Sequence, residues 1–97
     1  MFVCLNYELY FSWLNVCFLV NHHLGEILRT IVQELAPKTC LELGTYCGYS
    51  AVLMASVLPK GSRLITLEAQ EDIAEFAKEF TKLAGDDVNE KVGACQY

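Results

Sequence analysis

The sequence predicts an α/β domain built on a parallel sheet. Two short apolar runs, residues 39–43 and 64–67, have the length and composition of buried strands. Three stretches with the apolar pattern of helices lie before, between and after them. Strands that alternate with helices in this way form right-handed crossover units, so the strands should lie side by side and parallel. We expect two to three parallel strands flanked by helices.

The first helix is predicted upstream of the first strand, where apolar residues recur at i, i+3, i+4, i+7, i+8 and i+11. These residues are Leu24, Ile27, Leu28, Ile31, Val32 and Leu35. Pro37 ends the pattern, and the stripe should cover one face of the sheet. Residues 51–58 are apolar nearly all round, as expected of a buried helix that joins the two strands.

The third helix follows the second strand and has a second stripe of the same kind. Its members are Ile73, Phe76, Ala77, Phe80, Leu83 and Ala84. Asp72 and Glu75 are spaced as a capping box, and Gly85 is placed to end the helix. After Gly85 the acidic residues 86–87 suggest a loop, and residues 90–92 the remnant of a third strand.

A glycine turn after the first strand is the main functional signal. Gly44 and Gly48 bracket it, and the missing Cβ atoms allow the backbone to approach a ligand closely. In an open parallel sheet such turns lie at the carboxyl ends of strands, where ligands bind. Glu42 precedes the turn, and Glu68 closes the next strand, where a carboxylate can accept hydrogen bonds from ribose hydroxyls.

The spacing of this turn separates two ligand classes. A dinucleotide fingerprint requires G-x-G-x-x-G, whereas Gly44 and Gly48 form G-x-x-x-G without a middle glycine. An acid beside free backbone N–H groups suits a ligand with an ammonium group and hydroxyls, and S-adenosylmethionine is such a ligand. The alternative is that the glycines are ordinary turn residues and Glu68 is a solvated strand end.

These residues resemble a known family. Residues 41–52, Leu-Glu-Leu-Gly-Thr-Tyr-Cys-Gly-Tyr-Ser-Ala-Val, are similar to the cofactor-binding segment of catechol O-methyltransferases, and the similarity continues through residues 61–68, Gly-Ser-Arg-Leu-Ile-Thr-Leu-Glu. It extends over residues 25–85. The resemblance implies part of a Rossmann-like class I methyltransferase fold, S-adenosyl-L-methionine as the cofactor, and methyl transfer to a catechol hydroxyl in catecholamine metabolism.

The resemblance also implies roles for single residues. Glu42, Gly44 and Tyr46 would line the methionine part of the cofactor, and Ser50 would hold its carboxylate. Glu68 would hold the ribose.

Further positions are carried over near the adenosine and upstream. Ala69 would lie beside the adenosine. Residues 93–96, Gly-Ala-Cys-Gln, resemble the Gly-Ala-Ser-Gln of the family at the adenine edge, so Cys95 would place a weak thiol donor where the family has a hydroxyl, next to Gln96. Val20 coincides with a valine that contacts the cofactor.

In the family, the catalytic lysine and the Mg²⁺ ligands lie beyond the point where this sequence stops, so no catalytic or metal-binding residue is predicted here. In a complete enzyme, Mg²⁺ would hold both catechol oxygens and lower the pKa of the attacking one, while the lysine takes its proton. For the isolated chain we expect cofactor binding that is weak or absent and no turnover. The alternative is a non-catalytic truncated isoform that associates with a full-length copy, since the edges of a short sheet invite pairing.

Composition supports a partial domain. A chain of 97 residues forms one domain at most and buries only about 60–65% of its unfolded surface. A hydrophobic content of 54% is high for this length, as expected of a piece cut from a buried parallel sheet. The 12 Asp and Glu against 7 Lys and Arg argue against a nucleic-acid partner.

Residues 1–23 differ from the methyltransferase part, residues 24–97. The first 20 residues contain no Lys or Arg and are rich in aromatic residues, but Asn6, Glu8, Ser12 and Asn15 interrupt them before the about 20 apolar residues that a membrane span requires. The alternatives are an anchor, an interfacial helix, a helix packed on the sheet, and an exon-derived start that replaces the usual N-terminus of the family. The 5 cysteines lack a C-x-x-C pair and are odd in number, which favours a reducing compartment and hence the cytoplasm, with membrane association as an alternative.

Overall fold

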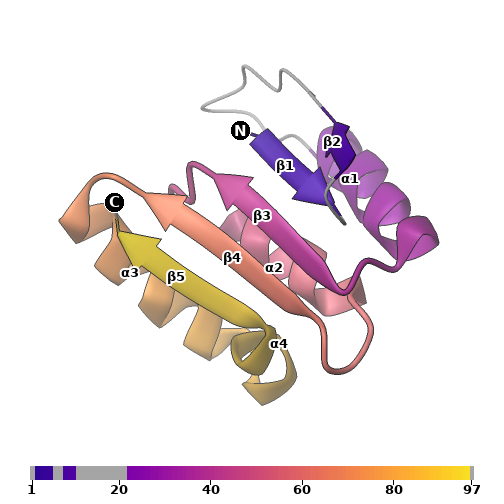
Figure 1. Ribbon diagram of the computed structural model, residues 1–97. Helices are drawn as coiled ribbons and strands as arrows, with labels where there is room; N and C mark the ends of the chain where they lie inside the picture. The colour runs from indigo at the N-terminus through magenta and orange to yellow at the C-terminus, as the bar shows by residue number, and fades with distance from the viewer. Residues whose placement is uncertain (1, 6–7, 11–21, 97) are drawn as a thin grey trace.

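A computed structural model describes residues 2–5, 8–10 and 22–96 (Figure 1). In chain order its elements are β1 (Phe2–Leu5), β2 (Glu8–Tyr10), α1 (His22–Leu35), β3 (Thr39–Leu43), α2 (Tyr49–Val57), β4 (Arg63–Glu68), α3 (Glu71–Leu83), α4 (Asp86–Lys91) and β5 (Val92–Gln96). The α/β prediction is confirmed, and both predicted strands form.

The strands make one sheet in the order β2-β1-β3-β4-β5. β3, β4 and β5 are parallel, while β1 pairs antiparallel with both β2 and β3. In the register of the parallel part, Glu42 lies opposite Thr66 and Glu68 opposite Gln96. The carboxyl ends of the three parallel strands therefore meet at one edge of the sheet.

The hydrophobic core lies between the sheet and the helices. Figure 1 shows α2, α3 and α4 behind the sheet, and among the described residues no helix covers the face turned to the viewer. The core side chains are Leu28, Val32, Cys40, Ala51, Met54, Ala55, Leu58, Leu64 and Val88. On the other face Leu41, Ile65 and Leu67 are half-buried and Leu43 is 38% exposed, so this apolar face is only partly covered.

The first helix covers less of the sheet than its stripe predicts. Leu28 and Val32 enter the core, but Ile27 and Ile31 are 57% and 42% exposed. The reason is that α1 packs mainly against α2. A Cβ atom built at Gly25 would lie 3.2 Å from Leu53 Cδ2, so α1 and α2 are in close contact at this glycine. Ile27 and Ile31 of the predicted stripe remain exposed to solvent.

The region after β4 differs from the prediction in two ways. α3 begins at Glu71 with Gln70 at its N-cap and no side-chain capping bond, so the predicted capping box is wrong. The acidic residues after Gly85 form α4 instead of a loop, and a complete five-residue β5 follows instead of a remnant. Tertiary contacts hold α4 in place, because Val88 is buried in the core and Lys91 Nζ donates hydrogen bonds to the carbonyl oxygens of Ala55 (3.1 Å) and Leu58 (2.8 Å).

The N-terminal residues that the structure describes form strands, not the helix that was one alternative. β1 lies along β3, with Val3 opposite Glu42, and thus adds an antiparallel edge to the parallel sheet. Residues 11–21, which include the predicted cofactor contact Val20, lie outside the described residues. None of the described helices is both long enough and apolar enough to span a bilayer.

Candidate functional site

The turn after β3 folds over the end of β4. The backbone N–H groups of Gly44 and Thr45 both donate to the carbonyl oxygen of Leu67, at 2.9 and 3.1 Å. This reversal requires φ values of 91° at Gly44 and 88° at Gly48, in the region that glycine adopts without steric cost. A Cβ atom at Gly44 would meet nothing within 4 Å, so open space borders the turn there.

Glu68 ties the end of β4 to this turn. Its carboxylate accepts hydrogen bonds from three backbone N–H groups, those of Tyr46 (2.9 Å), Ala69 (3.0 Å) and Gln70 (3.1 Å). Tyr46 has a φ of 50°, a strained value for a residue with a side chain, and such strain clusters at ligand-binding sites. The hydrogen bond from its N–H group to Glu68 helps to hold this conformation.

Glu42 has the opposite environment, because its side chain is fully buried. Ser50 Oγ donates a hydrogen bond to Oε2 of Glu42 at 2.5 Å, and Thr66 Oγ1 donates to Oε1 at 2.6 Å. Burial raises the pKa of Glu42 above its ordinary value of 4.5, and the two hydroxyl donors oppose this shift. A positive charge placed beside this carboxyl group would therefore favour its ionised form.

The two acids lie on the same side of the sheet. Thr66 is opposite Glu42 in the register, and Glu68 follows Thr66 by two residues, so its side chain shares that face. They differ in access, since Glu68 is half-buried, whereas Glu42 is fully buried. The sequence prediction missed Thr66 and Thr45, whose hydroxyl oxygens are 2.6 Å apart in the same network.

The other predicted positions lie around Glu68 or outside the described residues. Ala69 is exposed directly after it. The backbone of β5 places Gln96 opposite Glu68 and Cys95 opposite Leu67, so both lie at the end of the sheet that carries Glu68. β5 therefore places a third strand end beside those of β3 and β4, where the sequence predicted only the remnant of a strand.

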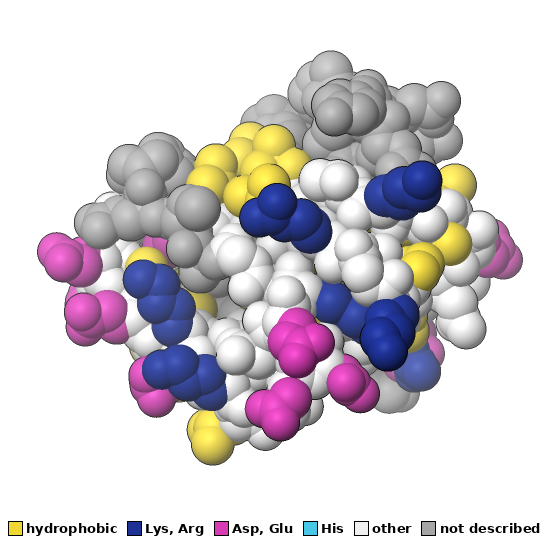
Figure 2. Space-filling model, turned by 60° about the horizontal axis from the view of Figure 1, so that its bottom comes forward, with side chains coloured by type: hydrophobic (Ala, Val, Ile, Leu, Met, Phe, Trp, Pro, Cys, Tyr) yellow, Lys and Arg dark blue, Asp and Glu magenta, His cyan; other side chains and the backbone are white. Residues whose placement is uncertain are grey.

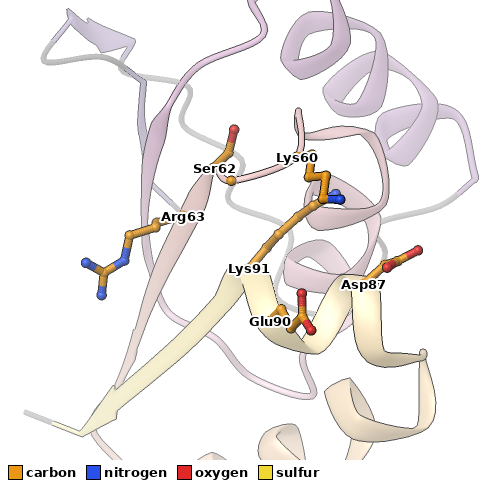
Figure 3. A pocket seen from close by; sticks show the side chains of 7 residues that line it. Lys60, Ser62, Arg63, Asp87, Glu90 and Lys91 are labelled. Carbon is orange, nitrogen blue, oxygen red and sulfur yellow. The ribbon is translucent and has the colours of Figure 1, made fainter.

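A cavity of about 490 Å³ lies at the other end of the sheet, near the start of β4, lined by Lys60, Gly61, Ser62, Arg63, Asp87, Glu90 and Lys91. Its charged groups do not converge: Figure 3 shows the side chains of Arg63 and Asp87 pointing away from each other, and Lys91 donates to the carbonyl oxygens of Ala55 and Leu58. Acidic and basic side chains also stand side by side over the face in Figure 2, which therefore offers no continuous basic surface.

Metal ligands do not gather in the part of the chain that the structure describes. No three His, Cys, Asp or Glu side chains come together there in a way that could hold an ion. The residues present in this part therefore do not fit a Mg²⁺ site.

Comparison with known proteins gives a consistent result. The chain is 46% identical over 78 residues to the transmembrane O-methyltransferase homolog of Mus musculus, covering 77% of this chain and 30% of that protein. It is 52% identical over 66 residues to catechol O-methyltransferase B of Danio rerio, covering 68% and 25%. The chain thus spans less than a third of the length of these curated relatives.

A solved structure and a family model agree with these relatives. The structure of an O-methyltransferase from Bacillus cereus in complex with SAH superposes with a TM-score of 0.76 and 32% identity, covering 82% of this chain and 36% of that one. The model of the O-methyltransferase family matches residues 10–95, which include the glycine turn and both acids. The chain belongs to the O-methyltransferase family.

Proposed function

We propose that the chain binds S-adenosylmethionine at the carboxyl ends of β3 and β4. The observation that carries the proposal is the position of Glu68, whose half-buried carboxylate stands at the end of β4 and is joined to the glycine turn through Tyr46 N–H. A ligand held by Glu68 therefore lies against that turn. The complex of the Bacillus cereus relative with SAH supports a cofactor of this class.

Glu68 suits the ribose of the cofactor. A carboxylate has about four acceptor positions, and three backbone N–H groups occupy Glu68 in this structure. The two ribose hydroxyls would share these positions and release Tyr46 N–H from its bond. Ala69 is exposed beside this carboxylate, and the β5 backbone brings Gln96 opposite it, so we assign the adenine edge to residues 95–96.

Glu42 and Ser50 suit the methionine end. Glu42 would face the ammonium group, whose positive charge offsets the cost of ionising a buried carboxyl group. Ser50 lies in the first turn of α2, where the positive end of the helix favours the methionine carboxylate. Gly44 and Tyr46 complete this end of the site, because the turn next to Gly44 is open.

The reaction that we propose for the complete protein is methyl transfer to a catechol hydroxyl. The sulfonium of S-adenosylmethionine supplies an electrophilic methyl group, and the residues of this chain bind and orient that donor. The groups that hold Mg²⁺ and the catechol, and the base, would come from outside residues 1–97. We therefore assign this chain the cofactor half and expect no turnover from it alone.

Calorimetry with two ligands tests the cofactor assignment. Titration of the chain with S-adenosylhomocysteine should give a weak, saturable heat, whereas NAD should give none, because the turn lacks the middle glycine of the dinucleotide fingerprint. The matched control is Glu34→Gln, which removes an exposed negative charge on α1 and should leave the heat unchanged. Binding of NAD in preference to S-adenosylhomocysteine would contradict the assignment.

A second candidate function is association with a full-length copy of the enzyme, without catalysis. It is favoured by the apolar sheet face of Leu41, Leu43, Ile65 and Leu67, which the described helices leave partly uncovered. We also propose a cytoplasmic location for the chain, with membrane contact through residues 1–23 as an alternative.

Co-purification tests that second function. The tagged chain should retain a full-length relative when the two are expressed together, and Leu43→Lys should reduce the retained amount, because it places a charge on the exposed apolar face. Lys38→Glu, a change on an exposed residue just before β3, serves as a control for altered charge. A monodisperse monomer that retains none of the relative would exclude this function.

A further inference from the structure

Four side chains form a buried hydrogen-bonded network beneath the glycine turn. Thr45 is 3% exposed, Ser50 7%, and Glu42 and Thr66 are fully buried. The oxygen atoms are joined at 2.6 Å between Thr45 and Thr66, 2.6 Å between Thr66 and Glu42, and 2.5 Å between Ser50 and Glu42. No buried side-chain nitrogen or oxygen atom in the described part of the chain lacks a partner, so the network is complete.

The direction of the hydrogen bonds follows from counting protons. A threonine hydroxyl carries one proton, and Thr66 donates it to Oε1 of Glu42. Thr66 is therefore the acceptor in its contact with Thr45, and Thr45 must be the donor. The chain of donation runs from Thr45 through Thr66 to Glu42, while Ser50 donates to the other carboxylate oxygen.

The backbone fixes the first member of this chain. Thr45 N–H donates to Leu67 O at 3.1 Å, and Thr45 O accepts from Gly48 N–H at 3.0 Å, so the turn itself holds Thr45 above β4. A change in the turn is thus transmitted to the carboxyl group through the two threonines.

We infer that Thr45 is a positioning residue, which acts through Thr66 to hold the Glu42 carboxylate in the ionised form and orientation that receive a cationic ligand. The inference rests on the proposed function for the identity of that ligand. A hydrogen bond that Thr66 accepts polarises its own O–H group and strengthens the bond that it donates. Without Thr45 the carboxylate loses part of this support, while burial continues to favour its neutral form.

Other ionisable groups near the network are few in the described part of the chain. They are Glu68 at the end of β4, Tyr46 and Cys47 in the turn, and Tyr49 in the first turn of α2. Ser50 and Thr66 are the side-chain donors that favour the ionised form, and Thr45 supports one of them.

The test compares Thr45→Val with Thr45→Ser in the 97-residue chain. Valine keeps the shape and removes the hydroxyl, whereas serine keeps the donor. The pH titration of Glu42 is followed by the ¹³C chemical shift of its carboxyl carbon, and the affinity for S-adenosylhomocysteine by calorimetry at several pH values. The titration midpoint should rise in Thr45→Val and return close to the wild-type value in Thr45→Ser, and the affinity should fall by about 3- to 10-fold in the first variant only.

The outcomes separate this inference from the proposed function. An unchanged Glu42 midpoint in folded Thr45→Val would overturn the inference, because a merely structural threonine lowers stability without moving that titration. If no variant binds S-adenosylhomocysteine, the proposed function fails, but the midpoint still decides the role of Thr45. If Thr45→Val does not fold, Thr45→Ala provides the same comparison, with less volume in the turn and the same missing donor.

Discussion

Glu42→Gln is expected to stabilise the fold near neutral pH and to weaken cofactor binding. The carboxyl group has a raised pKa in the folded chain and an ordinary pKa near 4.5 in the unfolded chain. Between these two values the folded chain holds more protons, so its free energy of unfolding falls as the pH rises. A neutral glutamine removes this loss, since its carbonyl accepts the hydrogen bond from Thr66 and its amide group can donate to Ser50.

Binding should change in the opposite direction. Loss of the negative charge that faces a ligand ammonium group costs about 2–5 kcal/mol, or at least roughly a thirtyfold loss of affinity. The affinity of the wild-type chain should rise with pH through the pKa of Glu42, because the ligand ammonium group favours the ionised carboxylate. The affinity of Glu42→Gln should not change with pH over this range. Urea unfolding and calorimetry between pH 5 and 8, with Glu34→Gln as the control, check both parts. If Glu42→Gln is less stable than the wild type at neutral pH, burial of the Glu42 carboxylate does not lower the free energy of unfolding there, and this prediction is wrong.

Glu68→Ala is expected to remove binding of the adenosine part with little effect on the core. Two ribose hydroxyls that donate to a charged acceptor contribute about 2–4 kcal/mol together, so the affinity for S-adenosylhomocysteine should fall roughly 30- to 700-fold. The turn should also loosen, because the Tyr46 N–H group loses its acceptor at 2.9 Å. Calorimetry measures the first effect, and amide hydrogen exchange at Tyr46 measures the second without any ligand.

The matched control for this variant is Glu75→Ala, which removes an exposed acid from the adjoining helix α3. It should alter neither the affinity nor the exchange rate of Tyr46 N–H. Equal loss of affinity in the two variants would point to long-range charge and would exclude a direct role for Glu68. An unchanged exchange rate of Tyr46 N–H in Glu68→Ala would show that the turn is held by its own backbone.

The central part of the fold was predictable because its signals are local. Residues 39–43 and 64–67 are short apolar runs that form β3 and most of β4, and the helices between and after them follow from periodicity and from Gly85. Errors arose where distant contacts decide. α4 is helical because Val88 and Lys91 reach the core and the end of α2, and no local pattern encodes those partners.

The candidate site divides in the same way. Glycines at 44 and 48, with an acid before the turn and another at the end of the next strand, indicate a cofactor site through residue type and spacing alone. Their different roles were not predictable, since a sequence does not say which carboxylate the turn will cover. The structure buries Glu42 beneath Thr45, Ser50 and Thr66, which raises the pKa of its carboxyl group, and leaves Glu68 half-buried.

By itself, the sequence determined the alternation of strands and helices, the turn with its two glycines, and the positions of the two acids, because spacing and backbone preference act over a few residues. Only the tertiary structure decided that β1 borders β3, that α1 leans on α2, and that Thr66 links the turn to a buried carboxyl group. These features depend on register and packing between segments far apart in the chain. Their free energy comes from contacts that exist only once the sheet has formed.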